Sequence, residues 1–215
     1  IIRSAGGDLN GFVGLAGLVA GIYAGVLFLK SGYTLGSTHE QPRAAAFIMP
    51  LTVAALLVFL VFKISPAQGA PLFFSAEGPG SKHAPLVISL AAGLVIGVIA
   101  QRSRFCTVGS FRDIFVIKDF HLFSGVAAMF VTVLLCNLLT GSFKIGFESQ
   151  PVAHSSHVWN FLGMSLSGLA FVLAGGCPGR QFIMSGEGDS DAAIFIAGMG
   201  AGAAFAHNFK TASSA

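Results

Sequence analysis

The chain alternates long apolar stretches with short polar segments. Leu9 to Leu29 contains no charged residue, and neither does Ala44 to Phe62. A helix needs about 20 mostly apolar residues to cross a bilayer, with a range near 17–25. We therefore predict about six spanning helices, of which the third and the sixth are shorter than the rest. The remaining four stretches are Ala84 to Ala100, Leu122 to Ser142, Val158 to Pro178 and Ala192 to Ala206.

The composition favours a membrane protein. Hydrophobic residues make up 54% of the chain and charged residues 10%, against roughly 25% charged in a typical soluble domain. The alternative, buried helices of a large soluble protein, leaves too little polar sequence to coat the helices. A net charge of +3 does not indicate a nucleic-acid partner, and no glycine-rich nucleotide loop suggests a cofactor. We expect an all-α integral membrane protein in a lipid bilayer.

Glycines in the first stretch recur at helical spacing. Gly14, Gly17, Gly21 and Gly25 are three or four residues apart, which places them on one face of a helix. Small residues at this spacing let two helices approach closely in lipid. Simple tolerance of glycine in membrane helices explains the pattern equally well.

The chain also contains an internal sequence repeat. Residues 1–10 align without gaps with residues 182–191, so that Ser4 pairs with Ser185 and Asp8 with Asp189. Five spans separate the starts of the two copies, and an odd number inverts the second copy, as in many transporters. We therefore assign residues 1–30 to the end of a first repeat and residues 31–215 to the remaining spans, including the second repeat. A cysteine turn precedes only the second copy, so we expect the chain to be the C-terminal part of a longer protein.

Two turns containing cysteine and arginine interrupt the apolar runs, at residues 101–113 and 175–181. In the second turn, Gly175 and Gly176 break a helix, and Pro178 suits the first position of the next one. Cys177 would then lie at a helix N-terminus, where the helix dipole and Arg180 favour an anion and a thiolate. The alternative is a surface loop with an incidental cysteine.

The first turn contains the same residue types. If Phe105 to Val116 is helical, Cys106 and Ser110 share a face, and Arg112 lies away from it. We expect Cys106, Arg104, Thr107 and Ser110 to line a substrate pathway together with Cys177 and Arg180. Arg102 and Arg112 fit better as interfacial anchors, with Asp113 neutralising Arg112.

Other polar positions have simpler interpretations. Cys136 lies within a span, where free cysteine is a common small core residue, and Asn137 is expected to bond to another helix. The three cysteines show no CxxC spacing, so neither a metal site nor a disulfide framework is indicated. His154 and His157 lie in or beside a polar loop and are predicted to be surface residues. Asp189 or Asp191 is expected to cap the last helix.

Together the motifs resemble the YeeE/YedE family of sulfur-transport membrane proteins, over essentially the whole chain. The closest similarity is to the YedE-like branch associated with selenium metabolism. The resemblance rests on Gln101–Asp113 and Gly175–Gln181, with His83–Leu86, Gly186–Asp189 and Ala206–Phe209 typical of that branch.

The resemblance implies a multi-pass protein of the bacterial inner membrane with re-entrant half-helices that carry cysteines. It implies passage of a small sulfur or selenium anion along Cys106 and Cys177, without enzyme activity or cofactor. Two alternatives stay open: a persulfide or selenosulfide carrier that delivers to a cytoplasmic sulfurtransferase-like protein, and a non-transporting scaffold for selenium metabolism. Transport would require a complementary N-terminal fragment, a partner subunit or a homo-oligomer.

Overall fold

The computed structural model describes residues 1–34, 44, 47–62, 84–147 and 156–209 of the chain. This part is helical and contains no strand; one isolated bridge joins Asp8 to Gly146. The all-α prediction is confirmed. The chain forms two compact units, residues 1–37 with 105–180 and residues 38–104 with 181–215.

Each of the six apolar stretches contains a helix among its described residues, although the helix lengths differ from the expected ones. Four helical segments of the described chain are long and apolar enough to cross a membrane, and two shorter apolar helices accompany them. The third stretch forms a helix that ends at Ser103, and a further helix, Thr107–Ile117, begins after the first cysteine turn, whereas the second stretch forms one of the two shorter helices. The long segments are Leu9–Lys30, Leu86–Ile117, His121–Leu139 and His157–Gly186, and the short ones are Ile48–Phe62 and Ser190–Ala206.

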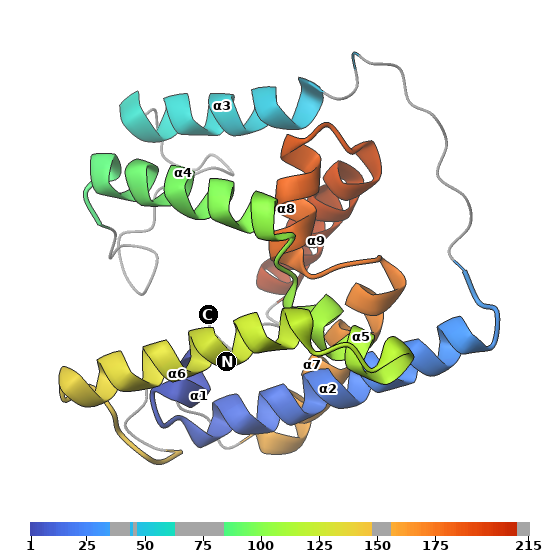
Figure 1. The fold of residues 1–215 in the computed structure, drawn as a ribbon. Helices are drawn as coiled ribbons and strands as arrows, with labels where there is room; N and C mark the ends of the chain where they lie inside the picture. Colours follow the sequence, from blue (N-terminus) through green and yellow to red (C-terminus); the bar gives the residue numbers. More distant parts are fainter. Residues whose placement is uncertain (35–43, 45–46, 63–83, 148–155, 210–215) are drawn as a thin grey trace. The chain divides into compact units, whose positions relative to one another are not determined.

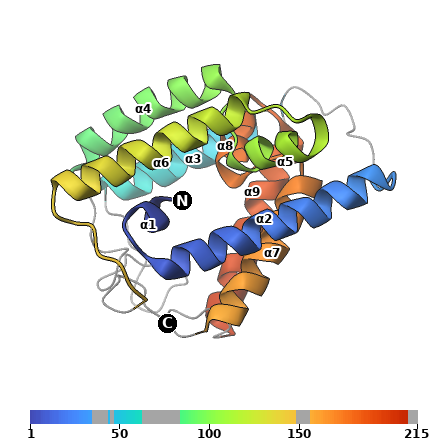
Figure 2. The same cartoon turned by 60° about the horizontal axis from the view of Figure 1, so that its bottom comes forward.

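The first unit is built around one pair of helices, α2 and α7 (Figures 1 and 2). The short α1 and the longer α6 contact each other, and α5 packs against α2, α6 and α7. The elements are α1 (Ile2–Ala5), α2 (Leu9–Lys30), α5 (Thr107–Ile117), α6 (His121–Leu139), α7 (His157–Leu173) and the first residues of α8 (Pro178–Gly186).

The glycine face of α2 is buried against α7. A methyl group added at Gly21 would collide with the backbone carbonyl oxygen of Ser165, and one at Gly17 with that of Phe161. On the opposing helix, a methyl group at Gly168 would collide with the carbonyl oxygen of Leu18. The two backbones therefore lie in direct contact, which only glycine permits. The packing interpretation of Gly14, Gly17, Gly21 and Gly25 is confirmed, since all four are buried.

The helices α2 and α7 run parallel. Positions near the start of α2 face the start of α7, and Gly25 near its end faces Val172 near the end of α7. Two parallel spans of one chain must be separated by a return crossing of the membrane. The parallel arrangement agrees with α2 and α7 being the first and fifth of the spans counted along the sequence.

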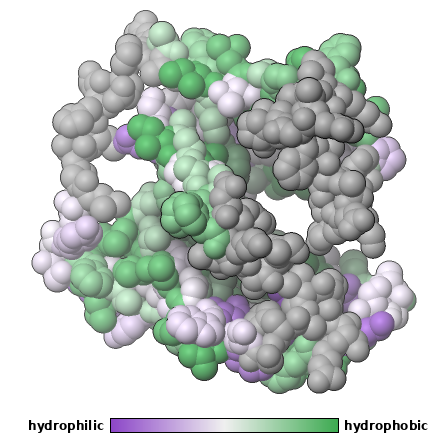
Figure 3. Space-filling model, turned by 180° about the vertical axis from the view of Figure 1, so that it is seen from behind, coloured by the Kyte–Doolittle hydropathy of each residue, from purple (hydrophilic) through white to green (hydrophobic). Residues whose placement is uncertain are grey.

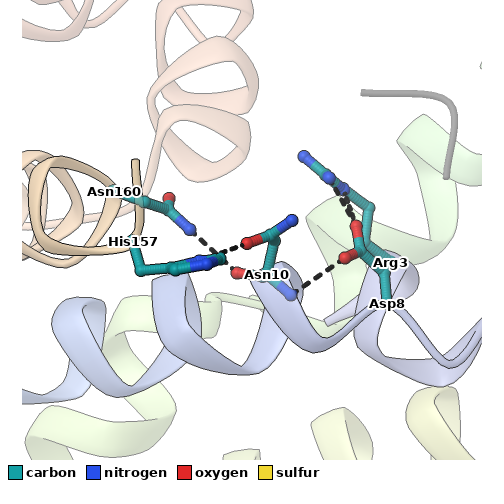
Figure 4. A network of polar contacts seen from close by, with 5 residues as sticks. All are labelled: Arg3, Asp8, Asn10, His157 and Asn160. Carbon is teal, nitrogen blue, oxygen red and sulfur yellow. Dashed lines mark hydrogen bonds and ion pairs between the residues drawn. The ribbon is translucent and has the colours of Figure 1, made fainter. Parts of the chain in front are cut away.

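Polar side chains join the first turns of this helix pair (Figure 4). Asn10, on α2, is almost fully buried; its Oδ1 lies 2.8 Å from His157 Nδ1, and its carbonyl oxygen accepts a hydrogen bond of 2.9 Å from Asn160 Nδ2. Because an amide oxygen only accepts, His157 Nδ1 carries the proton. The prediction that His157 is a surface residue was wrong; His154 lies outside the described residues.

Asp8 fixes the start of α2. Its Oδ1 accepts a hydrogen bond of 2.9 Å from Asn10 N, and its Oδ2 pairs with the Arg3 guanidinium. Asn137 on α6 donates to the carbonyl oxygen of Ala5 at 3.2 Å, as expected for an amide within a span. These bonds satisfy polar groups that hydrocarbon cannot solvate.

The two aligned segments have the same local structure. Gly7 and Gly188 both have positive φ, +92° and +96°. Asp189 Oδ1 accepts from Asp191 N at 3.0 Å and caps α9, as Asp8 caps α2. The preceding turns also match, with Asp8 N bonded to Arg3 O and Asp189 N to Met184 O. The inverted orientation stays a prediction, because α2 and α9 belong to different units.

The second unit holds α3 (Ile48–Phe62), α4 (Leu86–Ser103), most of α8 and α9 (Ser190–Asn208). Neither α3 nor α4 has a buried residue, and hydrophobic residues cover much of the coloured surface in Figure 3. Apolar side chains exposed on this scale are solvated by lipid in a membrane protein.

The glycine interface predicts a paired stability result. Alanine favours a helix over glycine by about 1 kcal/mol, but Gly21→Ala places a methyl group against the Ser165 backbone. We expect Gly21→Ala to destabilise the protein by about 1–3 kcal/mol, measured as a lower thermal unfolding midpoint in detergent. Gly97→Ala on α4, where no atom lies within 4 Å, is the matched control and should be neutral or stabilising. Equal midpoints for the two variants would contradict direct backbone contact.

The two aspartate caps predict unequal costs. Asp8 is 1% exposed and paired with Arg3, whereas Asp189 is partly exposed. Asp189→Ala should cost about 1 kcal/mol through loss of the cap, and Asp8→Ala about 1–3 kcal/mol, because Asp8 is buried and its carboxylate also makes an ion pair with Arg3. Unfolding midpoints of the two variants measure the difference. A larger loss for Asp189→Ala would contradict the assigned role of Asp8.

Candidate functional site

Cys106 begins α5 through its side chain. Its backbone is extended, with φ −148° and ψ 114°, and its Sγ accepts a hydrogen bond of 3.2 Å from Gly109 N. A residue in this position caps the helix, a role that oxygen side chains usually fill. The thiol is thereby held at the positive end of the α5 dipole.

Cys177 holds the same position before α8. A positive φ of +83° at Gly175 redirects the chain after α7, and α8 begins at Pro178 as predicted. The Sγ of Cys177 accepts from Arg180 N at 3.4 Å. In each turn the sulfur therefore bonds to the N–H three residues later, so both cysteines have the same local geometry.

The two cysteine turns meet within the first unit. The backbone N–H of Cys177 donates to Cys106 Sγ at 3.3 Å, although the residues are 71 positions apart. The thiols also lie in contact with each other, and the N–H groups of Thr107 and Val108 lie near the Cys177 sulfur. Each sulfur thus lies near the N-termini of both helices. Both thiols are free.

The helix pair α2–α7 supports this site. Cys106 and Val108 pack in one buried cluster with Leu18 and Ile22 of α2 and Val172 of α7, and Cys177 lies against it. Cys106 is 7% exposed, whereas Cys177 is only partly buried. The sulfur atoms therefore lie between an apolar wall and a set of backbone N–H donors.

Arg180 brings a positive charge into the first turn of α8, three residues after Cys177. Its Nη1 is buried and has no hydrogen-bond partner among the described residues. Arg112, in contrast, pairs with Asp113, whose Oδ1 lies 2.9 Å from Arg112 Nε. The neutralisation of Arg112 is confirmed. A buried guanidinium nitrogen without a partner favours an anion, because desolvation is costly unless the charge is compensated.

The remaining candidate residues differ in position. Thr107 is the first residue of α5, and Ser110 is fully buried on the same helix. The Ser110 hydroxyl donates to Thr107 O at 2.7 Å, so its proton is already engaged. Arg104 ends α4 with a left-handed backbone and belongs to the second unit. Its contribution to the pathway stays a prediction.

Cys136 does not share this environment. It is exposed on α6, so the prediction of a buried core residue was wrong. Only Val126 of α6 is buried, because this helix touches the unit along a narrow strip.

The site is suited to hold a soft anion without bonding to it covalently. Two cysteine sulfur atoms and several backbone N–H groups converge, Arg180 follows in the first turn of α8, and soft thiol groups suit a sulfur-containing anion. No group of three or more metal-ligating side chains occurs in the described ranges. The backbone donors of Val108, Gly109 and Cys177 were not predicted, because amide groups give no signal in the residue pattern.

Comparison with known proteins identifies a family that the chain matches. A family model described as sulphur transport matches residues 102–214, just over half of the chain. A thiosulfate transporter TsuA from Spirochaeta thermophila is 34% identical over 114 residues, which cover 52% of this chain and 34% of that protein. The thiosulfate transporter TsuA from Escherichia coli K12 is 27% identical over 104 residues, 48% of this chain and 29% of that protein.

The matched part of the chain thus spans about a third of each relative's length. No solved structure matches the chain. The family model includes both cysteine turns and the residues that bring their sulfur atoms together. The chain therefore belongs to the sulphur transport family, also known as YeeE/YedE.

Proposed function

We propose that the protein moves thiosulfate, or a closely related sulfur anion, through the bacterial inner membrane by way of Cys106 and Cys177. One observation carries the proposal: the backbone N–H of Cys177 bonds to the Cys106 sulfur, so two cysteines from distant turns meet at the N-termini of two helices. Both relatives described above are named thiosulfate transporters, which supports a sulfur anion as the substrate. We infer that thiosulfate is the first species to test, ahead of a selenium anion.

The positive charge of the site explains attraction of the anion. The N-termini of α5 and α8 each present backbone N–H groups, some of which bond to the cysteine sulfur atoms, and a partial positive charge. Arg180 adds a full charge from the first turn of α8. Arg104, two residues before Cys106 in the sequence, would extend this attraction. In a water-poor environment these fields act strongly, because little solvent screens them.

The two thiols can hold the anion weakly and release it again, which allows it to pass. Each sulfur accepts a backbone N–H bond, and the two thiols interact with each other. An arriving anion takes the S–H protons as hydrogen-bond donors in place of the thiol–thiol contact. Thiol donors are weak, so the anion is held loosely enough to leave. Thr107 and Ser110 could also donate hydrogen bonds to the anion, but the Ser110 hydroxyl would first have to break its hydrogen bond to Thr107 O.

This mechanism leaves both cysteines chemically unchanged, so no enzyme activity is included in it. The rival persulfide or selenosulfide carrier would leave a sulfur or selenium atom on Cys106 or Cys177. A sulfurtransferase-like partner, a homo-oligomer and a complementary fragment stay predictions. Because the matched part covers about a third of each relative, binding is best tested separately from uptake.

If thiosulfate binds at the site, it should protect Cys177 from alkylation. In a Cys136→Ser background, thiosulfate should slow alkylation of Cys177 by N-ethylmaleimide severalfold, since the anion occupies the thiol. Arg180→Gln should remove most of the protection by removing the charge, whereas Lys118→Gln, a surface change at the other end of α5, should retain it. The rates are followed by mass spectrometry of the purified protein. Identical alkylation rates with and without thiosulfate would contradict the proposed site, and a lasting mass increase on either cysteine would favour the persulfide carrier.

The proposed pathway predicts different thiosulfate uptake in two cysteine variants. Cells without their own thiosulfate carriers, expressing the protein, should lose uptake of radiolabelled thiosulfate when Cys177→Ala is introduced. Cys136→Ala should leave uptake unchanged, because Cys136 lies on the exposed surface of α6. An excess of unlabelled selenite measures whether a selenium anion competes. Full uptake in the Cys177→Ala variant, with equal amounts of membrane-inserted protein, would contradict the pathway.

A further inference from the structure

The two thiols of the site differ in access while lying in contact. Cys177 N is 3.3 Å from Cys106 Sγ, and the two thiol groups interact directly. Cys106 is 7% exposed and packed against the apolar cluster, whereas Cys177 is partly open. A reagent that reaches the site therefore meets Cys177 first, with Cys106 directly behind it.

We propose that Cys106 and Cys177 form a redox-active dithiol that closes into an intramolecular disulfide when a polythionate reacts with Cys177. The closure of the anion path rests on the proposed function. Formation of the disulfide does not, since it requires only two thiols in contact and a site that attracts anions. Polythionates are anions with sulfur–sulfur bonds, so the charges that attract thiosulfate also attract them.

The reaction balances with tetrathionate as the oxidant. The Cys177 sulfur, after losing its proton, attacks one of the two central sulfur atoms, the central S–S bond breaks, and one thiosulfate leaves. Cys177 then carries an –S–SO₃⁻ group. The Cys106 sulfur, also deprotonated, attacks the Cys177 sulfur and expels a second thiosulfate. The two cysteines are oxidised by two electrons, tetrathionate is reduced to two thiosulfates, and two protons are released.

The order of attack follows from the surroundings of each sulfur. Cys177 Sγ accepts a hydrogen bond of 3.4 Å from Arg180 N at the N-terminus of α8 and lies near the first N–H groups of α5. Such donors stabilise a thiolate, which is the reacting species. Cys106 is more deeply buried and is positioned to resolve the adduct. The remaining cysteine, Cys136, lies exposed on α6.

Disulfide formation would close the path, because it removes both S–H donors. A dithiol reductant would reopen it by exchange: it donates two electrons and two protons to the Cys106–Cys177 disulfide and is itself oxidised to a disulfide. The protein would then stop admitting sulfur anions while its surroundings are oxidising. The same two residues thus provide both passage and its control.

The test uses the purified protein with Cys136→Ser and tetrathionate as the probe. We expect loss of both remaining thiols and a single cross-linked peptide pair joining residues 106 and 177 within one chain, reversed by dithiothreitol. With Cys106→Ser added, the –S–SO₃⁻ group should stay on Cys177. With Cys177→Ser added instead, Cys106 should react about tenfold more slowly or not at all. Unfolding midpoints of the serine variants confirm that each is folded.

Three results would overturn the inference. These are stable adducts on both cysteines without a cross-link, cross-links only between chains, and faster reaction at Cys106 than at Cys177. Uptake of thiosulfate by oxidised and reduced cells tests the consequence, and unchanged uptake with a fully formed disulfide would refute closure. If the protein takes up no thiosulfate in either state, the proposed function fails, while peptide mapping still decides whether the dithiol exists.

Discussion

Direct backbone contact between α2 and α7 is the constraint on which the first unit depends. Gly17, Gly21 and Gly168 leave no room for a side chain at the crossing. In lipid, helices gain little from hydrophobic burial against each other, so close packing and hydrogen bonds provide the association. The bonds of Asn10 to His157 and Asn160 add specificity at one end of the pair. They also fix the register, because a shift along α7 would separate these polar groups.

The cysteine site depends on this helix pair. Leu18 and Ile22 of α2 and Val172 of α7 form the wall against which Cys106 and Val108 pack. That wall positions the first turn of α5 so that the Cys177 N–H reaches the Cys106 sulfur. Two broken helices thus present their N-termini to one location. Irregular backbone is tolerated at membrane depth where protein buries it or where it lines a cavity, and here its N–H groups bond to sulfur.

Local features could be predicted from the sequence, whereas contacts between distant segments could not. Helical spacing identified the glycine face, and proline chemistry placed Pro178 at the start of α8. The meeting of Cys106 with Cys177 depends on how α5 and α8 pack, which no local pattern encodes. The bond between His157 and Asn10 requires α2 and α7 to be parallel, so His157 was misassigned. Cys136 was misassigned because cysteine is usually buried in soluble proteins, while a membrane helix can direct it toward lipid.

The most direct test of the account is the position of a bound substrate analogue. Selenosulfate replaces the terminal sulfur of thiosulfate with selenium, whose anomalous scattering locates it in crystals of the protein. The account predicts a selenium peak beside Cys106 and Cys177, with the oxygen atoms toward Arg180. A peak elsewhere in the protein, with both thiols still in contact with each other, would contradict it.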